Sequence, residues 1–526
     1  MSSTDEKQVD TTTAPAVDPG SRPATVAEVL VTRPALPLYK DWGALKLYAV
    51  LFPGVLLVSS TVGFEGSLMN GIQSLTTWNT FFHPSTTITG LINSTYWLGA
   101  TLAYPFAQLI GDRYGRKSVI YVSAAVSIIG TVLQTASQNV ATFVVARIFF
   151  GFCAILGGNS AAVLVAESVH PRDRKVVTSL YNSSYYIGAI LAAWTTYGTG
   201  KNIDNGWAWR LPSLLQGILM LINIVFLPFV PESPRWLVAQ GRHDDALSTL
   251  ASAHGNGDAN DALVQAEFHE IRESIELQSA VRSPWKTMWN GSANRKRLFL
   301  LFYIGLCLNL SGNGLVSYYL SKVLDAVGVT SEDEQTLING ILSIVSWVTC
   351  LVAAWASHYL GRRVQFLMSA TTMFGSFIAV TVADATIIKD PANKGASYAV
   401  IFFVFLFMCG YNWAFNPLAY AYPAEILPYN LRLVGMSTVL FACTLAGYFN
   451  QWVNPVGLAN ITWRYYIVYV AWLFVEIVVI YFTFPETLGF ALEEIAPLLE
   501  GDTFITKIRK PQDTKTAAIH FDSESD

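Results

Sequence analysis

Charged residues are scarce in this chain. Of its 526 residues, only 13% are Asp, Glu, Lys or Arg and 52% are hydrophobic, whereas an ordinary soluble protein carries roughly 25% charged residues. This composition excludes a disordered chain and argues against a water-soluble enzyme. The 33 lysines and arginines are spread along the sequence and the net charge is −4. We therefore expect no basic surface for nucleic acid.

Cysteines and catalytic motifs are also few. The five cysteines all lie inside apolar stretches, at Cys153, Cys307, Cys350, Cys409 and Cys443, so neither a disulfide framework nor a zinc site is expected. The sequence lacks G-x-S-x-G, H-E-x-x-H and a glycine-rich phosphate loop, which are motifs of hydrolases, metalloproteases and nucleotide-driven pumps. We predict that the protein is not an enzyme and holds no metal or cofactor.

Long apolar segments are abundant. A helix needs about 20 mostly apolar residues to cross a bilayer with its backbone groups bonded internally. Twelve segments satisfy this condition: 47–68, 88–111, 118–136, 140–166, 176–199, 211–230, 298–321, 336–357, 364–383, 397–424, 433–459 and 465–484. Only Glu65, Arg147 and Glu476 are charged within them. We therefore predict an all-α membrane protein with twelve transmembrane helices.

The basic residues predict the orientation of these helices, because cytosolic loops carry an excess of Lys and Arg. With both chain ends in the cytosol, most of the 33 basic residues are cytosolic. The exceptions in outer loops are Lys201, Arg210, Lys322, Lys389, Lys394 and Arg464. The expected segments are a disordered N-terminus (1–44), an N-terminal six-helix bundle (45–230), a cytosolic loop with short helices (231–297), a C-terminal six-helix bundle (298–484) and a cytosolic tail (485–526).

Three motifs recur in the two halves at a spacing of about 250 residues, which indicates an internal duplication. GDRYGRK (111–117) is echoed by HYLGRR (358–363), and PESPRW (231–236) is echoed by PETLGF (485–490). The third pair joins a Glu to an Arg seven residues later, after the fourth and the tenth segment. Such repeats imply two pseudo-symmetric bundles with a binding site between them near the membrane midplane.

The charged residues of these motifs fall at cytosolic helix ends, where acids meet arginines and helix N-termini. We interpret them as a cytosolic gate of breakable salt bridges that lock the halves together when the pathway is open to the outside. Ordinary charge anchoring at the membrane surface is the alternative. The gate residues are Asp112, Arg113, Arg116, Glu167, Arg174, Glu232, Arg235, Arg362, Glu425, Arg432 and Glu486.

With these motifs, the sequence resembles the major facilitator superfamily and its sugar porter branch. Arg147 in ARIFFG and the closing PETLGFALEE (485–494) belong to the same resemblance, which covers about residues 45–500. GFEGSLMNGI (63–72), SGNGLVSYYL (311–320) and FNQWVNPVGLANITWRYY (449–466) are similar to fungal lactose-permease-type and hexose transporters. The resemblance implies the major facilitator fold and carriage of disaccharides, hexoses or related glycosides.

The resemblance also implies a role for the charges inside the membrane. Proton-coupled sugar porters carry an acid at the position of Glu65 and an arginine at that of Arg147. Our hypothesis is that deprotonated Glu65 pairs with Arg147, and that protonation releases the arginine and lets the first span close over the sugar. A permanent ion pair that orients two helices is the alternative. Glu476, in the twelfth span, is interpreted as an anchor bonded to a neighbouring helix.

A sugar site combines amides, hydroxyls and aromatic platforms, and needs few charges. By resemblance, Asn182 and Asn309 fall where sugar-binding glutamines are usual, and Phe415 falls at a stacking tryptophan. The predicted substrate-binding set is Asn182, Tyr186, Asn309, Asn313, Tyr318, Phe415, Asn416 and Asn450. Short side chains at Ala189, Cys443 and Thr444 indicate a roomy cavity, which favours a disaccharide over a hexose. GNG at 312–314 and Pro417 are expected to loosen the seventh and tenth spans.

Together these features predict a proton symporter that imports a sugar, such as lactose, cellobiose or a hexose, by alternating access. Its partners would be the sugar, protons and the bilayer. We expect a monomer in the plasma membrane, with Asn460 as a candidate glycosylation site in an outer loop. Two alternatives stay open: a facilitator or exporter of another small metabolite, such as a polyol or secondary product, and a transporter-like nutrient sensor.

Overall fold

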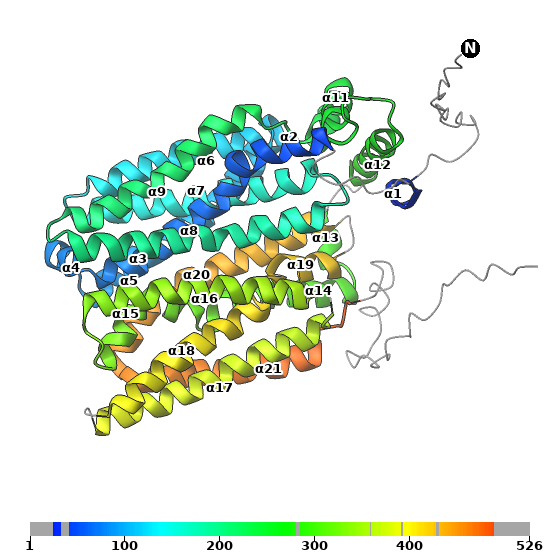
Figure 1. Ribbon diagram of the computed structural model, residues 1–526. Helices are drawn as coiled ribbons and strands as arrows, with labels where there is room; N and C mark the ends of the chain where they lie inside the picture. The colour runs from blue at the N-terminus through cyan, green and yellow to red at the C-terminus, as the bar shows by residue number, and fades with distance from the viewer. Residues whose placement is uncertain are drawn as a thin grey trace, which may run out of the picture.

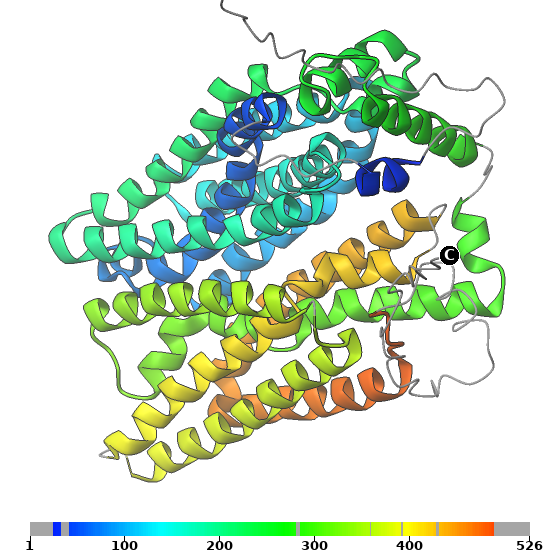
Figure 2. The ribbon, with the colours of Figure 1, turned by 45° about the vertical axis from the view of Figure 1, so that its right-hand side comes forward.

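The computed structural model describes residues 25–32, 41–279, 284–357, 359–390, 393–427 and 431–488. Every secondary-structure element in these ranges is a helix. The long helices form two groups that lie side by side, one from each half of the chain (Figure 1). The two groups remain distinct when the molecule is turned (Figure 2). This is the predicted fold, twelve membrane-spanning helices in two six-helix bundles.

In the first half, one span is built from α2 (Trp42–Leu51), the π-helical turn η2 (Phe52–Leu56) and α3 (Leu57–Ser74). The elements that follow are α4 (Thr76–Phe82), α5 (Thr86–Tyr114), α6 (Arg116–Thr135), α7 (Val140–Ser168), α8 (Arg174–Asn202), α9 (Trp207–Phe226) and η3 (Leu227–Phe229).

In the second half, two spans are broken, as the sequence predicted. Gly312 has φ +103° and separates α14 (Ser292–Leu310) from α15 (Asn313–Ala326), a conformation that glycine adopts without strain. Pro417 lies between α18 (Lys394–Ala414) and α19 (Leu418–Ile426). The other elements are α16 (Glu332–Ala356), α17 (Arg362–Lys389), α20 (Arg432–Ile461), η5 (Thr462–Arg464) and α21 (Tyr465–Thr483).

Short helices fill the connection between the halves: α10 (Pro234–Ala239), α11 (His243–His254), α12 (Ala262–Ser279) and α13 (Pro284–Trp289). A further helix, α1 (Val26–Thr32), lies in the segment expected to be disordered. Val29 of α1 packs against Leu263 and Ala266 of α12, and this apolar contact stabilises a helix that sequence alone did not indicate. The rest of 1–40 and the tail beyond 488 lie outside the described residues.

Close helix packing positions the site in the first half. A Cβ atom on Gly63 of α3 would collide with the backbone of Tyr185 on α8, and one on Gly188 of α8 would collide with the backbone of Ser60 on α3. The two helices therefore touch backbone to backbone, as small residues allow in membrane bundles. This contact fixes α3, the helix that carries Glu65, against α8.

Nine segments of the described chain are long and apolar enough to cross a membrane by strict length and hydropathy criteria. One of these, Val434–Thr483, contains parts of both α20 and α21. The 29-residue helices α5 and α8 complete the twelve spans. Because α17 continues to Lys389, it includes Asp384, a 4% exposed acid that the predicted window 364–383 left outside the membrane.

The two ends of the bundle differ. The helices α1 and α11–α13 lie at one end, which we call the motif end because it also carries the repeated motifs (Figure 1). The opposite end, where α4 lies, is called the far end.

Candidate transport site

The carboxyl group of Glu65 lies inside the first half and is 0% exposed. Ser127 of α6 donates its hydroxyl to Oε1 at 3.0 Å. The thiol of Cys153 on α7 lies 3.6 and 3.8 Å from the two carboxyl oxygens and also contacts the carbonyl of Phe150 at 3.2 Å. The acid is thus held by neutral donors from two neighbouring helices.

Arg147 of α7 is likewise fully buried and lies next to this acid. Its Nη1 donates to the backbone carbonyl of Glu65 at 3.3 Å, rather than to the carboxyl group. The guanidinium carbon lies 4.9 Å from the centre of the Tyr96 ring, a cation–π contact. Two of its nitrogens, Nε and Nη2, are buried without a hydrogen-bond partner among the described residues. The predicted neighbours are brought together, but the carboxylate–guanidinium pair is not formed in this conformation.

A buried charge without a full set of partners is costly, roughly 2.5–3.5 kcal/mol at the bilayer centre even on insertion scales. Buried polar groups are almost always satisfied, so the two nitrogens of Arg147 that lack a partner are unusual and could donate to a further hydrogen-bond acceptor. Ionisable groups arranged in this way are characteristic of functional sites.

The two halves are tied together toward the far end. The amide of Asn70 on α3 donates to Asn339 Oδ1 on α16 at 2.8 Å and accepts from the backbone N–H of Leu320 on α15 at 3.2 Å. One turn later, Gln73 Nε2 donates to the carbonyl of Tyr318 at 3.0 Å. These bonds cross from the first half to the second, so α15 closes against α3 at this end.

Near the middle, a tyrosine of the first half meets two asparagines of the second. The hydroxyl of Tyr186 on α8 is bonded to Asn412 of α18, and Asn416 Nδ2 donates to the same hydroxyl at 2.6 Å. Asn412 Nδ2 is left without a partner, as are Asn313 Oδ1 and both amide atoms of Gln451 on α20. Unsatisfied amides of this kind supply the donors and acceptors that a polyhydroxylated ligand needs.

The other predicted sugar-binding residues have different surroundings. Asn309 Nδ2 donates to the carbonyl of Cys443 on α20 at 2.9 Å, and Asn450 donates to the hydroxyl of Tyr469 at 2.9 Å. Both bonds lie within the second half, as ordinary interhelical hydrogen bonds do. Phe415 is 1% exposed and its ring stacks on Tyr411, 5.9 Å between centres, so it belongs to the core of that half.

Two residues of the predicted set remain. Tyr318 is 7% exposed on α15 and lies at the α3 interface through its backbone carbonyl. Asn182 is partly buried on α8, one turn from Tyr186. Asn182 and Tyr186 lie on α8, which packs against α16 of the other half, and Asn313 and Tyr318 lie on α15, which packs against α3. Asn416, between α18 and α19, reaches the first half through Tyr186. The hydrogen bonds given for Asn309 and Asn450, and the ring contact of Phe415, are with residues of the second half, and their role in sugar binding stays a prediction.

At the motif end of the first half, the repeated motif builds a compact charge cluster. Arg116 Nε lies 3.6 Å from Glu167 Oε2 and its Nη1 lies 3.5 Å from Asp112 Oδ1. The carboxyl group of Glu232 accepts the first two N–H groups of α6, at 3.1 and 3.2 Å. Ser233 donates its hydroxyl to Glu167 at 2.5 Å. An acid that caps a helix N-terminus in this way is favoured by the helix dipole.

The second half repeats the arginine–glutamate pair, the capping glutamate and the hydroxyl donor of this cluster. Arg362 Nη2 lies 3.0 Å from Glu425 Oε1. Glu486 accepts the first two N–H groups of α17 at 2.6 and 3.2 Å, and Thr487 donates its hydroxyl to Glu425 at 2.5 Å. The internal duplication inferred from sequence is therefore matched in three dimensions.

The bonds of each of these two clusters join residues of the same half. Among the remaining predicted gate residues, Arg113 lies over the ring of Tyr114, 5.4 Å from its centre, and Arg235 donates to Ser274 of α12 at 3.3 Å. Arg174 and Arg432 are the first residues of α8 and α20. His358 and residues 428–430 and 489–494 of the motifs lie outside the described residues.

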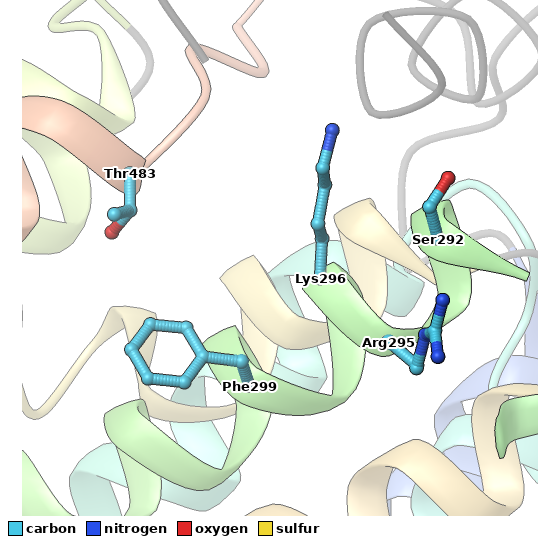
Figure 3. Close-up of a pocket in the computed structure, with 5 residues that line it drawn as sticks. All are labelled: Ser292, Arg295, Lys296, Phe299 and Thr483. Atoms are coloured by element: carbon cyan, nitrogen blue, oxygen red, sulfur yellow. The ribbon is translucent and has the colours of Figure 1, made fainter. Parts of the chain in front are cut away.

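A pocket of about 400 Å³ lies at the motif end of the second half, between α14 and α21 (Figure 3). It is lined by Ser292, Arg295, Lys296, Phe299 and Thr483. All five residues come from one half, so this pocket is not the predicted sugar site.

Sequence reasoning missed the side chains that hold Glu65. Ser127 and Cys153 are single polar residues in apolar helices, and nothing in their local sequence distinguishes them. The amides of Asn412 and Gln451 were visible as polar residues inside spans, yet only the structure shows that their hydrogen bonds are incomplete.

A family model described as "Sugar (and other) transporter" matches residues 52–499. The chain belongs to this family. The MFS-type transporter criB of Aspergillus cristatus is 27% identical over 440 residues, which cover 83% of this chain and 90% of that protein. The low-affinity glucose transporter HXT3 of Saccharomyces cerevisiae is 29% identical over 452 residues, 83% of this chain and 78% of its own length.

Solved structures of the xylose transporter XylE from E. coli have the same fold. A partially occluded inward open conformation aligns with a TM-score of 0.71 at 19% identity, over 85% of this chain and 99% of XylE. A second structure, titled as the major facilitator superfamily proton:xylose symporter bound to 6-bromo-6-deoxy-D-glucose, aligns with a TM-score of 0.70. Membership of this sugar transporter family confirms the resemblance and the fold class, and makes the protein a membrane transporter rather than an enzyme.

Proposed function

We propose that the protein imports a sugar by alternating access and is driven by protons. Family membership supports a sugar as the substrate, and relatives named as glucose and hexose transporters support the same class. The observation that carries the proton-coupled mechanism is the buried carboxyl group of Glu65 beside a guanidinium with unused donors.

The motif end is assigned to the cytosol, because most lysines and arginines lie on that side of the predicted spans. The far end then faces outward, where Asn70 bonds to Asn339 and to α15. With this end tied and the motif clusters confined to their own halves, the conformation is an inward-facing one. We place the protein in the plasma membrane as a monomer with both termini in the cytosol.

In the proposed cycle, Glu65 alternates between two sets of partners. When it is deprotonated, it pairs with Arg147 and holds α3 away from the sugar. In the present conformation its carboxyl group contacts Ser127 and Cys153, while Arg147 bonds only to its backbone carbonyl. This is the arrangement expected once the pair has been released. In the outward-facing state the motif-end clusters would bind across the halves.

The sugar would bind where the halves meet, at Tyr186, Asn412, Asn416 and the unsatisfied amide of Asn313. Amides and a phenol recognise hydroxyl groups without needing charge. The short side chains of Ala189 and Cys443 leave room for a second sugar ring, so a disaccharide is favoured over a hexose. No cofactor takes part in this scheme, since the proton gradient supplies the energy.

The test is expression in a yeast that lacks its own sugar transporters, with lactose, cellobiose and glucose as radiolabelled substrates and a pH electrode in the medium. The wild type should accumulate one of these sugars and make the medium more alkaline as it enters. Glu65→Gln should still equilibrate the sugar but not concentrate it.

Glu273→Gln, which changes an exposed acid on α12, is the matched control and should behave as the wild type. Uphill accumulation by the Glu65→Gln variant would remove the coupling role from this residue. Uptake without alkalinisation in the wild type would reduce the protein to a facilitator.

A second candidate is a carrier of another small metabolite, such as a polyol or an exported secondary product. The family description includes substrates other than sugars, and two similar proteins are named only as MFS-type transporters. Absence of uptake for every sugar of the panel, in cells with the protein at the surface, would favour this candidate.

A further inference from the structure

A second carboxyl group, that of Glu476, is buried in the other half of the molecule. It lies on α21 and is 0% exposed. Trp472 Nε1, one turn earlier, donates to its Oε1 at 2.5 Å. The hydroxyl of Ser311, the residue directly after α14, lies 2.8 and 2.9 Å from its two oxygens. Among the described residues no Lys, Arg or His forms an ion pair with this carboxyl group.

The groups that face Glu476 are neutral at physiological pH. Cys307 and Tyr303 of α14 interact with it, and Tyr411 of α18 does so at longer range. The helices α17 and α20 and the turn η5, which also pack against α21 or its start, bring no interacting ionisable side chain to it within the described ranges. A negative charge at this position would therefore be buried without a counter-charge, which costs free energy.

The contacts of the Ser311 hydroxyl group depend on whether the carboxyl group of Glu476 carries a proton. Its hydroxyl oxygen lies 2.5 Å from the carbonyl oxygen of Cys307, a contact that needs a proton between the two atoms. A serine hydroxyl carries only one proton. If that proton serves the carbonyl, the contact with Glu476 is a hydrogen bond only when the carboxyl group supplies its own proton to the serine oxygen. If Glu476 is ionised, Ser311 must turn its proton to the carboxylate and leave the carbonyl.

The acceptor that Ser311 chooses for its hydroxyl proton affects the structure, because of where Ser311 lies in the chain. It is the last residue before Gly312, whose φ of +103° breaks the span between α14 and α15. The helix α15 then carries Tyr318 and Leu320, whose backbone groups bond to Gln73 and Asn70 of α3 and close the far end. The carboxyl group of Glu476 is thus connected to the closure between the halves through Ser311 and the backbone of α15, which is kinked at Tyr319.

We propose that Glu476 is a second proton-binding site of the transport cycle, and that its proton, through Ser311, holds the break before α15 in the closed-end position. Loss of the proton draws the Ser311 hydroxyl away from the carbonyl of Cys307 and loosens the last turn of α14. The proposal rests on the proposed function in one respect, which is that α15 must move during transport. It does not require that protons are coupled to sugar through Glu65.

The proton itself can be detected without transport. In full-length protein purified into lipid nanodiscs, infrared spectroscopy at neutral pH should show the carbonyl stretching band of a buried protonated acid. Glu476→Gln should remove one component of this band, whereas Glu273→Gln should not. An identical band in the wild type and in Glu476→Gln would overturn the proposal, whatever the protein transports.

The coupling to α15 is tested by the pH profile of sugar exchange in proteoliposomes. As the pH rises and Glu476 loses its proton, the wild-type exchange rate should fall by about tenfold per pH unit, as expected for one titrating group. We call this part of the profile the alkaline limb. Glu476→Gln should flatten that limb, and Glu65→Gln should keep it. A purely structural role would lower the rate of Glu476→Gln equally at every pH, which would contradict the proposal.

Ser311→Ala provides a second variant if the glutamine does not fold. It keeps the acid but removes the group that links it to α14. The alkaline limb should then shift along the pH axis, and an unshifted limb would contradict the role of Ser311 as the link.

Discussion

The two buried glutamates of this protein are surrounded by similar donors but by different charges. Glu65 contacts a serine and a cysteine, Ser127 and Cys153, and Glu476 likewise lies beside Ser311 and Cys307. Among the residues that the structure describes, only the first has a cation, Arg147, within reach. The comparison indicates that neutral donors, which at Glu476 include the indole of Trp472, can accommodate a buried carboxyl group without a cation, and the proposed proton coupling assigns Arg147 a role in transport.

The largest effect that can sharpen this comparison is the coupling between Glu65 and Arg147. In a double-mutant cycle of Glu65→Gln and Arg147→Gln, the rate of sugar exchange should show an interaction energy of about 1–3 kcal/mol, because neighbouring charged residues do not act independently. The matched cycle of Glu65→Gln with Glu476→Gln should be additive within about 0.5 kcal/mol, since the two acids share no partner.

This prediction is checked by measuring the rate of sugar exchange in proteoliposomes for all single and double variants at equal protein content. Additivity between Glu65 and Arg147 would show that the arginine acts elsewhere. Strong coupling between the two acids would mean that they form one site, and the contrast between the halves would be lost.

A smaller effect distinguishes the two serines. Ser311→Ala should lower the free energy of unfolding by about 1–2 kcal/mol, and Ser127→Ala by about 0.5–1 kcal/mol, in line with the net value of hydrogen bonds to buried groups. The difference is expected because Ser311 contacts both oxygens of its acid and a helix carbonyl, whereas Ser127 contacts one oxygen at 3.0 Å.

Thermal unfolding of the two variants in the same detergent measures this difference. A larger loss for Ser127→Ala would indicate that the first site, rather than the second, depends on its hydroxyl for stability.

The smallest effect concerns the cysteines. A thiol is a weak donor, and Cys153 lies 3.6 Å or more from the carboxyl oxygens of Glu65. Cys153→Ser and Cys307→Ser keep a donor of similar size, so transport should change by less than about twofold. Measured uptake that falls tenfold in either variant would assign the thiol a role that hydrogen bonding alone does not explain.

The fold was predictable because the bilayer imposes a simple rule on sequence. The lengths of the apolar segments predicted all twelve spans. GNG at 312–314 and Pro417 predicted where two of the spans are interrupted. The errors arose where that rule does not apply. Helix α1 is stabilised by contact with α12, and Asp384 is accommodated inside a longer helix than its window indicated.

The site was predictable in part. Charges inside spans had to have partners, so Glu65 and Arg147 were identified, and the repeats located the clusters of Glu232 and Glu486. Which neutral side chain faces which helix depends on rotation about the helix axis, which apolar sequence does not fix. For that reason the sequence did not indicate that Phe415 stacks on Tyr411 or that Asn450 bonds to Tyr469, and Ser127 was not identified at all.

The central claim is that sugar and protons cross the membrane together through a cycle that uses Glu65. The most direct measurement uses purified protein in proteoliposomes that contain a pH-sensitive dye and no other transporter. We predict that an inward gradient of the transported sugar alone drives protons into the vesicles, and that Glu65→Gln abolishes the proton signal while sugar still equilibrates. Sugar entry with no change of internal pH in the wild type would contradict the account.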